Sequence, residues 1–440
     1  MNLFSQFKLS NKNYFSFILA LFPLSFLAGN MLININIILI IISALILFNL
    51  SLFKIKYFLL DRLIVLFFLT ILLSAIFNDF YLYYNSNEFS TFRGVYVTTL
   101  KSILFLRYLL LYLVIRFLIE KDYINFKYLF IISSLCALFV CLDIFFQSIV
   151  GKDFFGYEAD PRSRKLGGPF GDEYIAGGYI QRFSLFSFFV FSAFYLKIKM
   201  KFNYMLFPIL FLVFFIGIML SGNRMPLILF LLATSLMFIL ENKKKKNLLF
   251  FLIFSFFTFF IVLNFNSTVN DNFRNFKGNI QKLVLNFYDK NSDFNHLPYK
   301  DEFSSAYITW KFNKVVGGGV KNFNYYCHKS NEKFNKNYKC NLHPHNYYLE
   351  ILTETGIIGF FIIIIIFLNI LYLILRKYFL LSKLQNNKII FPFVLLFLTE
   401  FFPIKSSGSF FTTGNASLIF LILALLVGIL LKDYSIENKN

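Results

Sequence analysis

The chain has 440 residues, of which 58% are hydrophobic and 15% are charged. Soluble domains carry roughly 25% charged residues, so this composition excludes a soluble globular protein and indicates a polytopic membrane protein. The net charge of +20 does not indicate nucleic-acid binding, because the lysines are spread between apolar stretches and form no single basic face.

The chain contains many apolar stretches of about 20 residues, the length that crosses a bilayer as a helix. The sequence therefore predicts an all-α integral membrane protein with about twelve transmembrane helices. The first stretch resembles a signal peptide, but a second span follows at once, so we expect a retained helix. The predicted spans lie near 14–29, 32–53, 61–77, 97–118, 128–149, 180–196, 203–220, 225–240, 247–264, 357–375, 389–404 and 416–431.

Short basic loops set the orientation of such a protein, because positively charged loops stay in the cytoplasm. With an even number of spans, both termini are then predicted to be cytoplasmic. The basic loops that fall on this side are 54–56, 197–201, 243–246, 376–388 and the residue Lys432. The segments that fall on the outer side are 78–96, 150–179, 221–224, 265–356 and 405–415.

This topology predicts three domains. Residues 1–264 form an N-terminal transmembrane bundle of about nine helices. Residues 265–356 are too polar to cross the membrane and too long for a simple connector, so we expect an external loop domain with short helices. Residues 357–440 form the C-terminal transmembrane helices and a short cytoplasmic tail.

The external loop contains two cysteines, Cys327 and Cys340. In an oxidising compartment they are candidates for a disulfide that closes a short loop. Two free thiols remain the alternative, because the sequence does not give their Cα separation.

Two arginines interrupt apolar sequence. Arg107 lies inside the run 103–115, where a charge is costly and marks a functional position by default. It could bind substrate, pair with Asp143 or line a cavity. Arg224 follows Ser221-Gly-Asn in a tight outer turn, where a guanidinium could bind a phosphate with two hydrogen bonds. The alternative for Arg224 is contact with lipid headgroups.

A glycine-rich segment, 167–183, opens the predicted sixth span and carries Asp172, Glu173 and Arg182. Acidic residues, glycines and an arginine at the outer interface suggest the edge of a binding pocket, with Arg182 as a candidate ligand of the substrate. A plain glycine-rich turn explains the same residues.

The most informative stretch runs from His343-Pro-His345-Asn346 to Gly356-x-x-Gly359, where the polar loop meets an apolar run. Pro344 suits the first position of a helix, which would place His345 in the first helical turn. The helix N-terminus disfavours imidazolium, so we expect a neutral His345 that can accept a proton. At 100° per residue, Gly356 and Gly359 lie below His345 and form a notch that another helix or a lipid tail could enter.

No metal site is predicted, because the four histidines have no cluster of external carboxylates beside them. No phosphate-binding loop or dinucleotide fingerprint is present either. We therefore expect neither a metal nor another cofactor.

His345-Asn346, the spacer and Gly356-x-x-Gly359 resemble the signature of the O-antigen ligase and O-antigen polymerase superfamily of bacterial envelopes. Arg224 in its Ser-Gly-x-Arg turn is similar to an arginine that the family uses to bind the diphosphate of the donor. The stretch Pro403-Ile-Lys405 to Thr413 resembles the family's tail motif, so Lys405 is a further candidate for substrate binding. The family's second external arginine, which precedes a tryptophan, has no counterpart before Trp310; Lys300, His296 and Lys311 are the candidate substitutes.

The resemblance implies an inverting, metal-independent glycosyltransferase of the bacterial inner membrane, with its active site on the periplasmic side. The donor would be a glycan on polyprenyl diphosphate, and membrane lipids would surround the enzyme. His345 would act as general base, Arg224 would stabilise the leaving diphosphate and Asn346 would orient the acceptor or the histidine. Gly356 and Gly359 would hold the lipid tail.

Three acceptors compete within this family. Lipid A core would make the protein a ligase, which we favour, a second lipid-linked glycan would make it a polymerase, and a protein hydroxyl is the third. From another class, a transporter that moves lipid-linked glycans across the membrane predicts charges near mid-membrane, whereas most candidate groups here gather on the predicted outer face.

Overall fold

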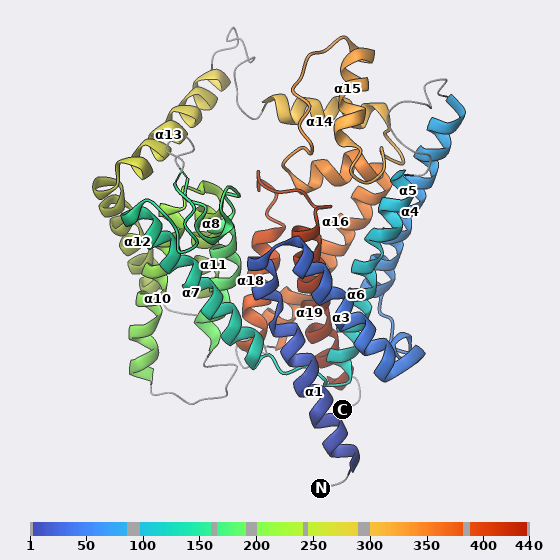
Figure 1. The fold of residues 1–440 in the computed structure, drawn as a ribbon, viewed down its shortest axis with the longest axis horizontal. Helices are drawn as coiled ribbons and strands as arrows, with labels where there is room; N and C mark the ends of the chain where they lie inside the picture. The colour runs from blue at the N-terminus through green and yellow to red at the C-terminus, as the bar shows by residue number, and fades with distance from the viewer. Residues whose placement is uncertain are drawn as a thin grey trace. The chain divides into compact units, whose positions relative to one another are not determined.

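The computed structural model describes residues 3–85, 97–159, 165–190, 200–240, 245–288, 300–381 and 388–437. Every regular element in these ranges is a helix, and an isolated bridge between Lys152 and Glu158 is the only strand pairing there. Figure 1 shows these helices along the chain. The predicted all-α fold is confirmed.

Seven helical stretches among the described residues are long and apolar enough to cross a membrane. Two shorter apolar helices accompany them, Leu206–Leu220 and Arg224–Leu240. These findings confirm a polytopic membrane protein, while the count of about twelve spans stays a prediction. The predicted span 180–196 and the basic loop 197–201 lie partly outside the described residues. The seven stretches are Asn30–Phe53, Leu59–Tyr81, Val97–Glu120, Lys127–Val150, Leu248–Phe265, Tyr347–Arg376 and Thr413–Lys432.

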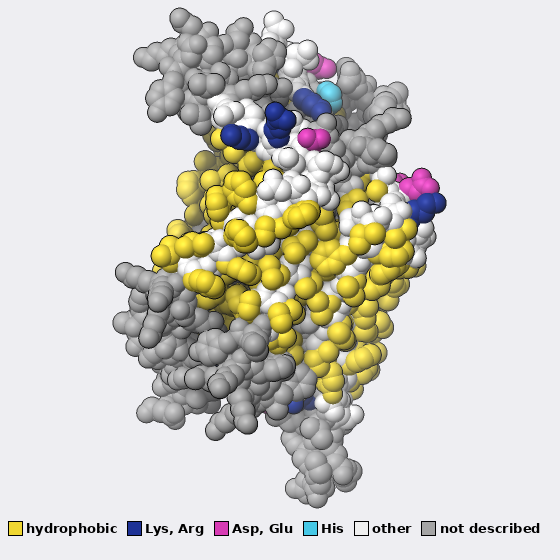
Figure 2. Space-filling view, turned by 90° about the vertical axis from the view of Figure 1, so that its left-hand side faces the viewer, with side chains coloured by type: hydrophobic (Ala, Val, Ile, Leu, Met, Phe, Trp, Pro, Cys, Tyr) yellow, Lys and Arg dark blue, Asp and Glu magenta, His cyan; other side chains and the backbone are white. Residues whose placement is uncertain are grey.

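Large apolar side chains cover the outside of several of these helices. On α12 (Lys245–Phe265), Phe250, Ile253 and Phe257 lie on one helical face and are 70%, 60% and 64% exposed. Figure 2 shows a broad apolar surface on one face of the molecule, with most of the charged side chains drawn beyond its upper edge. Because soluble proteins rarely expose continuous apolar surface of this kind, lipid is the expected solvent of this face.

The chain folds into two compact units, each made of three separate segments. The first unit comprises Met1–Ile40, Leu118–Ile280 and Arg376–Glu400, and the second comprises Ile41–Phe117, Gln281–Leu375 and Phe401–Asn440.

In the first unit, α7 (Lys127–Val150) is the central helix. It packs against α1 (Leu3–Ala20), α2 (Phe22–Ala28), α8 (Ala176–Phe183) and α10 (Met200–Leu220). Next in this unit, α11 (Arg224–Leu240) packs against α8 and α18 (Phe391–Glu400), and α12 is followed by α13 (Ser267–Tyr288). Short 3-10 turns complete it at Gly168–Phe170, Ser184–Phe189 and Lys388–Ile390.

In the second unit, α14 (Lys300–Phe312) and α15 (Phe323–Phe334) pack against each other, and Figure 1 shows them beyond the N-terminal end of α16 (Tyr347–Leu381). The other helices of this unit are α4 (Leu59–Asn85), α5 (Val97–Phe105), α6 (Arg107–Glu120) and α19 (Thr413–Glu437). Helix α3 (Asn30–Phe48) begins in the first unit and ends in the second. The 3-10 turn Asn49–Phe53 follows it.

A buried ion pair joins α4 to α6. Arg116 Nε lies 3.1 Å from Asp61 Oδ1, and the two side chains are 1% and 0% exposed. Tyr112 Oη donates to the same carboxylate oxygen at 2.6 Å, and the Phe58 N–H donates to the other at 2.9 Å. With its hydrogen bonds supplied, the buried pair is tolerated, and removing either partner would leave a charge without compensation. Sequence reasoning did not find this pair.

Predicted spans differ from the observed helices at several places. The span 14–29 is divided at Leu21, because Pro23 starts a new helix, α2. The span 97–118 is divided into α5 and α6 at Leu106. The span 357–375 is the central part of a longer helix, α16, that begins at Tyr347.

Candidate functional site

Asn346 begins α16. Its side-chain oxygen accepts hydrogen bonds from the backbone N–H groups of Tyr348 at 3.0 Å and Leu349 at 3.2 Å. These are N-cap contacts, which satisfy donors that the first helical turn leaves unpaired. His345 precedes the cap with a left-handed backbone, φ 53°. The prediction that His345 lies in the first helical turn is therefore wrong, because Asn346 takes the cap position instead of Pro344 taking the first helical one.

The left-handed backbone at His345 has a structural consequence. Non-glycine residues seldom adopt positive φ, and such residues gather at ligand-binding and catalytic positions. The conformation turns His345 out of the helix that follows it, and its side chain is partly exposed. The His345 side chain is therefore held at the start of a capped helix and stays partly accessible.

His343 lies beside His345, with 4.3 Å between the ring centroids. Burial and the neighbouring His345 lower the pKa of His343 from its usual 6.5 to about 4. His343 is therefore neutral at physiological pH and can share a hydrogen-bonding environment with His345 without adding a charge.

The tail loop, residues 401–412, lies against the start of α16. Asn346 Nδ2 donates to the backbone oxygens of Pro403 at 2.9 Å and Lys405 at 3.3 Å. Tyr348 Oη donates to the Phe401 oxygen at 2.6 Å. The histidine motif and the tail motif, both singled out from the sequence, are thus joined directly.

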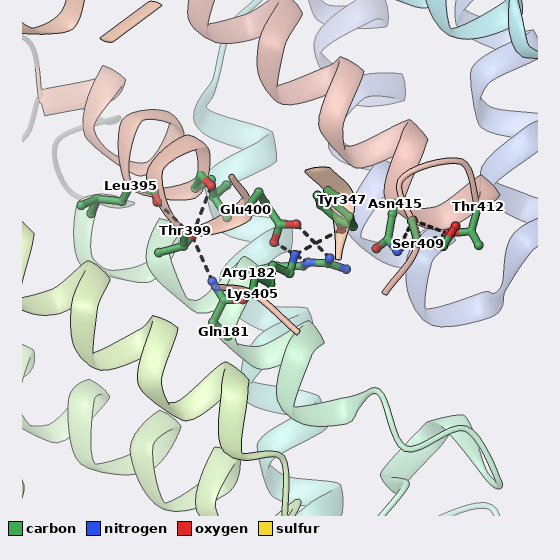
Figure 3. A network of polar contacts seen from close by, with 11 residues as sticks. Gln181, Arg182, Tyr347, Leu395, Thr399, Glu400, Lys405, Ser409, Thr412 and Asn415 are labelled. Carbon is green, nitrogen blue, oxygen red and sulfur yellow. Dashed lines mark hydrogen bonds and ion pairs between the residues drawn. The ribbon is translucent and has the colours of Figure 1, made fainter. Parts of the chain in front are cut away.

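Lys405 is placed by this contact. Its ammonium lies 3.2 Å from Tyr347 Oη and 4.5 Å from the centroid of the Tyr347 ring, and the residue is 6% exposed. Figure 3 shows the contact between Lys405 and Tyr347, and separately the hydrogen bonds of Asn415 with Ser409 and Thr412. A cation held against an aromatic ring keeps a defined position for an anionic ligand.

Glu350 holds the other side of the tail loop. The Ser409 hydroxyl donates to Glu350 Oε1, and the Phe410 N–H donates to Oε2 at 2.6 Å. The side chain is 1% exposed. Sequence reasoning gave Glu350 no role. The signal that could have found it is an acidic residue in the first turn of an apolar helix, where a carboxylate needs specific donors.

Gly356 marks a sharp kink in α16, with φ 67° and ψ −169°, a conformation open in practice only to glycine. A Cβ at this position would lie 2.1 Å from the backbone oxygen of Val315 and 2.6 Å from the Gly317 nitrogen. The predicted notch over Gly356 is therefore filled by the chain's own backbone, which corrects the expectation that a lipid tail or another helix enters there. At Gly359 a Cβ would meet the Thr355 side chain of the same helix.

The loop that fills this space is the glycine run before α15. Gly318 N–H donates to Thr353 O and Gly319 N–H to Glu354 O, both at 2.8 Å, and Ile357 N–H donates to Lys314 O at 3.0 Å. These bonds satisfy backbone groups that the kink releases from the helix. The glycine run therefore forms a defined contact with α16.

Cys327 and Cys340 are joined by a disulfide, with a Cα separation of 5.7 Å. Cys327 is fully buried beside Phe323 and Ala306, and Leu349 of α16 packs against the same cluster. The disulfide thus attaches the segment that leads to His343 and His345 to the helical pair α14 and α15.

Arg224 lies in the first unit, where it is the first residue of α11. Gly222 has φ 74°, and Asn223 Nδ2 donates to Ser221 Oγ at 3.2 Å, which closes the turn between α10 and α11. The guanidinium carbon lies 5.4 Å from the centroid of the Phe276 ring of α13. A ring against the guanidinium restrains the plane of that group.

The glycine-rich segment supports this turn. A Cβ at Gly177 would lie 2.4 Å from Ser221 Oγ, so only glycine lets α8 approach so closely. The Leu166 N–H donates to Ser221 O at 3.4 Å. The segment predicted as a pocket edge therefore packs directly on the Arg224 turn.

Arg182 forms a bidentate ion pair with Glu400, at 2.8 Å and 3.0 Å, and Gln181 donates to Thr399 at 3.2 Å (Figure 3). Arg182 is 18% and Glu400 0% exposed. The pair ties α8 to α18, and Glu400 neutralises the guanidinium that the sequence suggested for a substrate.

Arg107 donates to Leu104 O at 2.8 Å and to Tyr108 Oη at 2.7 Å, and Tyr108 Oη donates to Thr413 O at 3.4 Å. This series of hydrogen bonds connects Arg107 to the start of α19. The suggested partner Asp143 accepts a hydrogen bond from the Phe154 N–H.

Among the candidate substitutes for the second arginine, Lys300 is the first residue of α14, and His296 lies outside the described residues. Lys311 stacks on Tyr307 of the same helix at 4.6 Å.

Residues 209–364 match the family model described as O-Antigen ligase. This segment therefore belongs to the O-antigen ligase family. It includes the Arg224 turn, the external loop and the start of α16 as far as Gly359. The match supports a membrane glycosyltransferase of the ligase and polymerase type, a class that acts on lipid-linked glycans. No curated protein matches the chain at a significant level.

Proposed function

We propose that the protein transfers a glycan from polyprenyl diphosphate to lipid A core on the periplasmic face of the inner membrane. The observation that supports this most is the family match over 209–364, which contains both Arg224 and the His345-Asn346 helix start. The rigid placement of His345 ahead of an N-capped helix adds a physical reason to assign it the base.

In the proposed reaction, His345 takes the proton from a hydroxyl of the acceptor sugar. The oxygen attacks the anomeric carbon of the donor, and the bond to the diphosphate breaks. Arg224 stabilises the negative charge that develops on the lipid diphosphate, which removes the need for a metal ion. Because the displacement is direct, the configuration at the anomeric carbon inverts.

Asn346 and Lys405 serve the same reaction through the tail loop. Asn346 fixes the loop through two carbonyl groups and keeps His345 at the helix start. Lys405 supplies a buried cation beside Tyr347 for an anionic group of the substrate. A polymerase that adds the glycan to a second lipid-linked glycan would use the same chemistry, and the acceptor alone distinguishes it.

The test is reconstitution of the purified protein with a polyprenyl-diphosphate oligosaccharide. Lipid A core and additional donor are offered as acceptors in the presence of EDTA, and the products are identified by mass spectrometry and their anomeric configuration by NMR. We expect inverted glycan on lipid A core, and a loss of at least about 100-fold in rate for Arg224→Ala. Longer lipid-linked chains would establish a polymerase, and a retained configuration would exclude direct displacement. Transfer of the donor across liposomes without any glycan product would identify a transporter instead.

A further inference from the structure

Asp143 and Asp153 form a buried acidic pair that the proposed reaction does not use. Asp143 lies near the C-terminal end of α7 and is 0% exposed, and Asp153, in the loop that follows, is 3% exposed. The Phe154 N–H, which directly follows Asp153 in the chain, donates to Asp143, so the two aspartates lie near each other. Neither takes part in an ion pair with any described residue. Two adjacent buried carboxylates without a cation are unfavourable, so a positive partner is expected.

Each carboxylate has one oxygen that is satisfied and one that is not. Asp143 Oδ1 accepts from the Phe154 N–H at 2.7 Å. Asp153 Oδ1 accepts from the N–H groups of Phe155 at 2.9 Å and Tyr157 at 2.7 Å. The Oδ2 atoms of both aspartates are buried and make no hydrogen bond within the described chain. Buried polar atoms without a partner are rare in native proteins and point to a bound species.

A third side-chain oxygen lies at the same place. Gln147 follows Asp143 by four residues on α7, so the two project from one face of the helix. Gln147 Oε1 accepts from the Gly168 N–H at 2.9 Å and keeps a second lone pair. Gly168 has φ 55°, and a Cβ there would lie 3.7 Å from Asp143 Oδ2. Gly168 therefore adjoins both the amide oxygen and the unpartnered oxygen of Asp143.

We propose that Asp143, Asp153 and Gln147 bind a Ca²⁺ ion, with backbone carbonyl groups of residues 151–159 and 165–168 completing its coordination. Ca²⁺ takes six to eight oxygen ligands, on the order of what carboxylates, an amide and carbonyls supply, and it accepts irregular geometry. Mg²⁺ fits less well, because it demands an octahedron and retains several waters, whereas these side chains are buried. Zinc-like ions are not favoured, because all three side chains present oxygen atoms, whereas zinc prefers nitrogen and sulfur ligands.

The ion would stabilise the loop and take no part in the glycan-transfer reaction. The loop joins the end of α7 to the glycine-rich segment, and its last part contacts the Arg224 turn through the bond from Leu166 N–H to Ser221 O. The proposal is independent of the transfer reaction, since a structural ion here is compatible with a displacement that needs no metal.

The test uses the full-length protein in nanodiscs, freed of divalent ions with EDTA and then titrated with Ca²⁺ by calorimetry. We expect one Ca²⁺ to bind per chain, and saturating Ca²⁺ to raise Tm by several degrees, more than Mg²⁺ does. Asp143→Asn and Asp153→Asn preserve the shape of the side chains and should lose both effects. Gln147→Glu adds a third carboxylate and should tighten binding. The matched control is Glu158→Gln, which removes a negative charge from the same loop at an exposed position and should bind Ca²⁺ like the wild type.

Three results would overturn the proposal. The wild type could show no calcium-dependent heat or Tm shift, or the effects could persist in the double asparagine variant. A wild type that does not respond to Ca²⁺ and is less stable than the asparagine variants would mean that the two aspartates share a proton. Glycan transfer is measured separately, in EDTA and below the Tm of the ion-free protein. Failure of the Ca²⁺ proposal is thereby distinguished from failure of the proposed function.

Discussion

Asn346 has two roles that substitution can separate. Its oxygen caps α16, and its amide nitrogen holds the tail loop. Asn346→Ala removes both and should destabilise the protein by about 1 kcal/mol or more. Asn346→Asp keeps an oxygen acceptor at a helix N-terminus, where a negative charge is favourable, but cannot donate to Pro403 and Lys405. We expect Asn346→Asp to retain most of the wild-type Tm while raising the KM for the donor. Equal losses of Tm in the two variants would show that the cap contributes little.

His343 should make the stability of the protein sensitive to mild acid. Its pKa is about 4 in the folded protein and near its usual 6.5 in the unfolded chain. Between these values the unfolded chain binds the proton and the folded protein does not, so stability is lost as the pH falls from about 6.5 to about 4.

This effect is measured by comparing Tm against pH for the wild type and His343→Asn, which does not titrate. We expect the wild type to lose more Tm than the variant over this interval. Parallel curves would show that His343 is not held neutral by its surroundings.

At the scale of single elements, the kink in α16 depends on Gly356. A side chain there would need a backbone conformation that is unfavourable by about 1–3 kcal/mol, and its Cβ would collide with backbone atoms of Val315 and Gly317. We therefore expect Gly356→Ala to lower Tm strongly and to release the glycine loop. Gly278→Ala is the matched control, because a Cβ there meets nothing within 4 Å in helix α13. Limited proteolysis measures how well residues 314–320 are protected from cleavage. Equal protection of these residues in both variants would contradict the proposed role of Gly356.

The sequence was informative about α16 but could not reveal its kink. The apolar pattern continues without a break from Ile357 onward, and glycine pairs in membrane helices usually pack against other helices. The partner of Gly356 is a loop about 40 residues earlier in the chain, and a pattern within one helix carries no information about such a contact. The same reason explains why Glu350 was overlooked, since its donors Ser409 and Phe410 follow it by 59 and 60 residues.

At the scale of the whole molecule, composition and hydropathy were sufficient for the fold class, because apolar length and charge depletion report directly on the bilayer. The candidate residues were predictable where a short motif carries them, as at Arg224 and His345-Asn346. The division into two units was not predictable, because each is assembled from three distant segments. The buried partner of Arg182 was also hidden, since Glu400 lies 218 residues away.

The orientation in the membrane is a further prediction at this scale. Basic loops place both termini in the cytoplasm and the external loop in the periplasm. A fluorescent protein fused after Asn440 should therefore fluoresce, and alkaline phosphatase fused after Lys314 should be active. An active phosphatase fused after Asn440, with an inactive one after Lys314, would reverse the topology and place His345 on the cytoplasmic side.

The most direct test of the account is the rate of glycan transfer by His345→Ala, measured beside His328→Ala. His328 is an exposed histidine on α15 in the same unit, so its variant controls for the loss of an imidazole. A positioned general base contributes about 100-fold to 10,000-fold to the rate. We predict a loss of kcat in this range for His345→Ala with an unchanged Tm, and wild-type rates for His328→Ala. Wild-type transfer by a folded His345→Ala protein would contradict the assignment of His345 as the base.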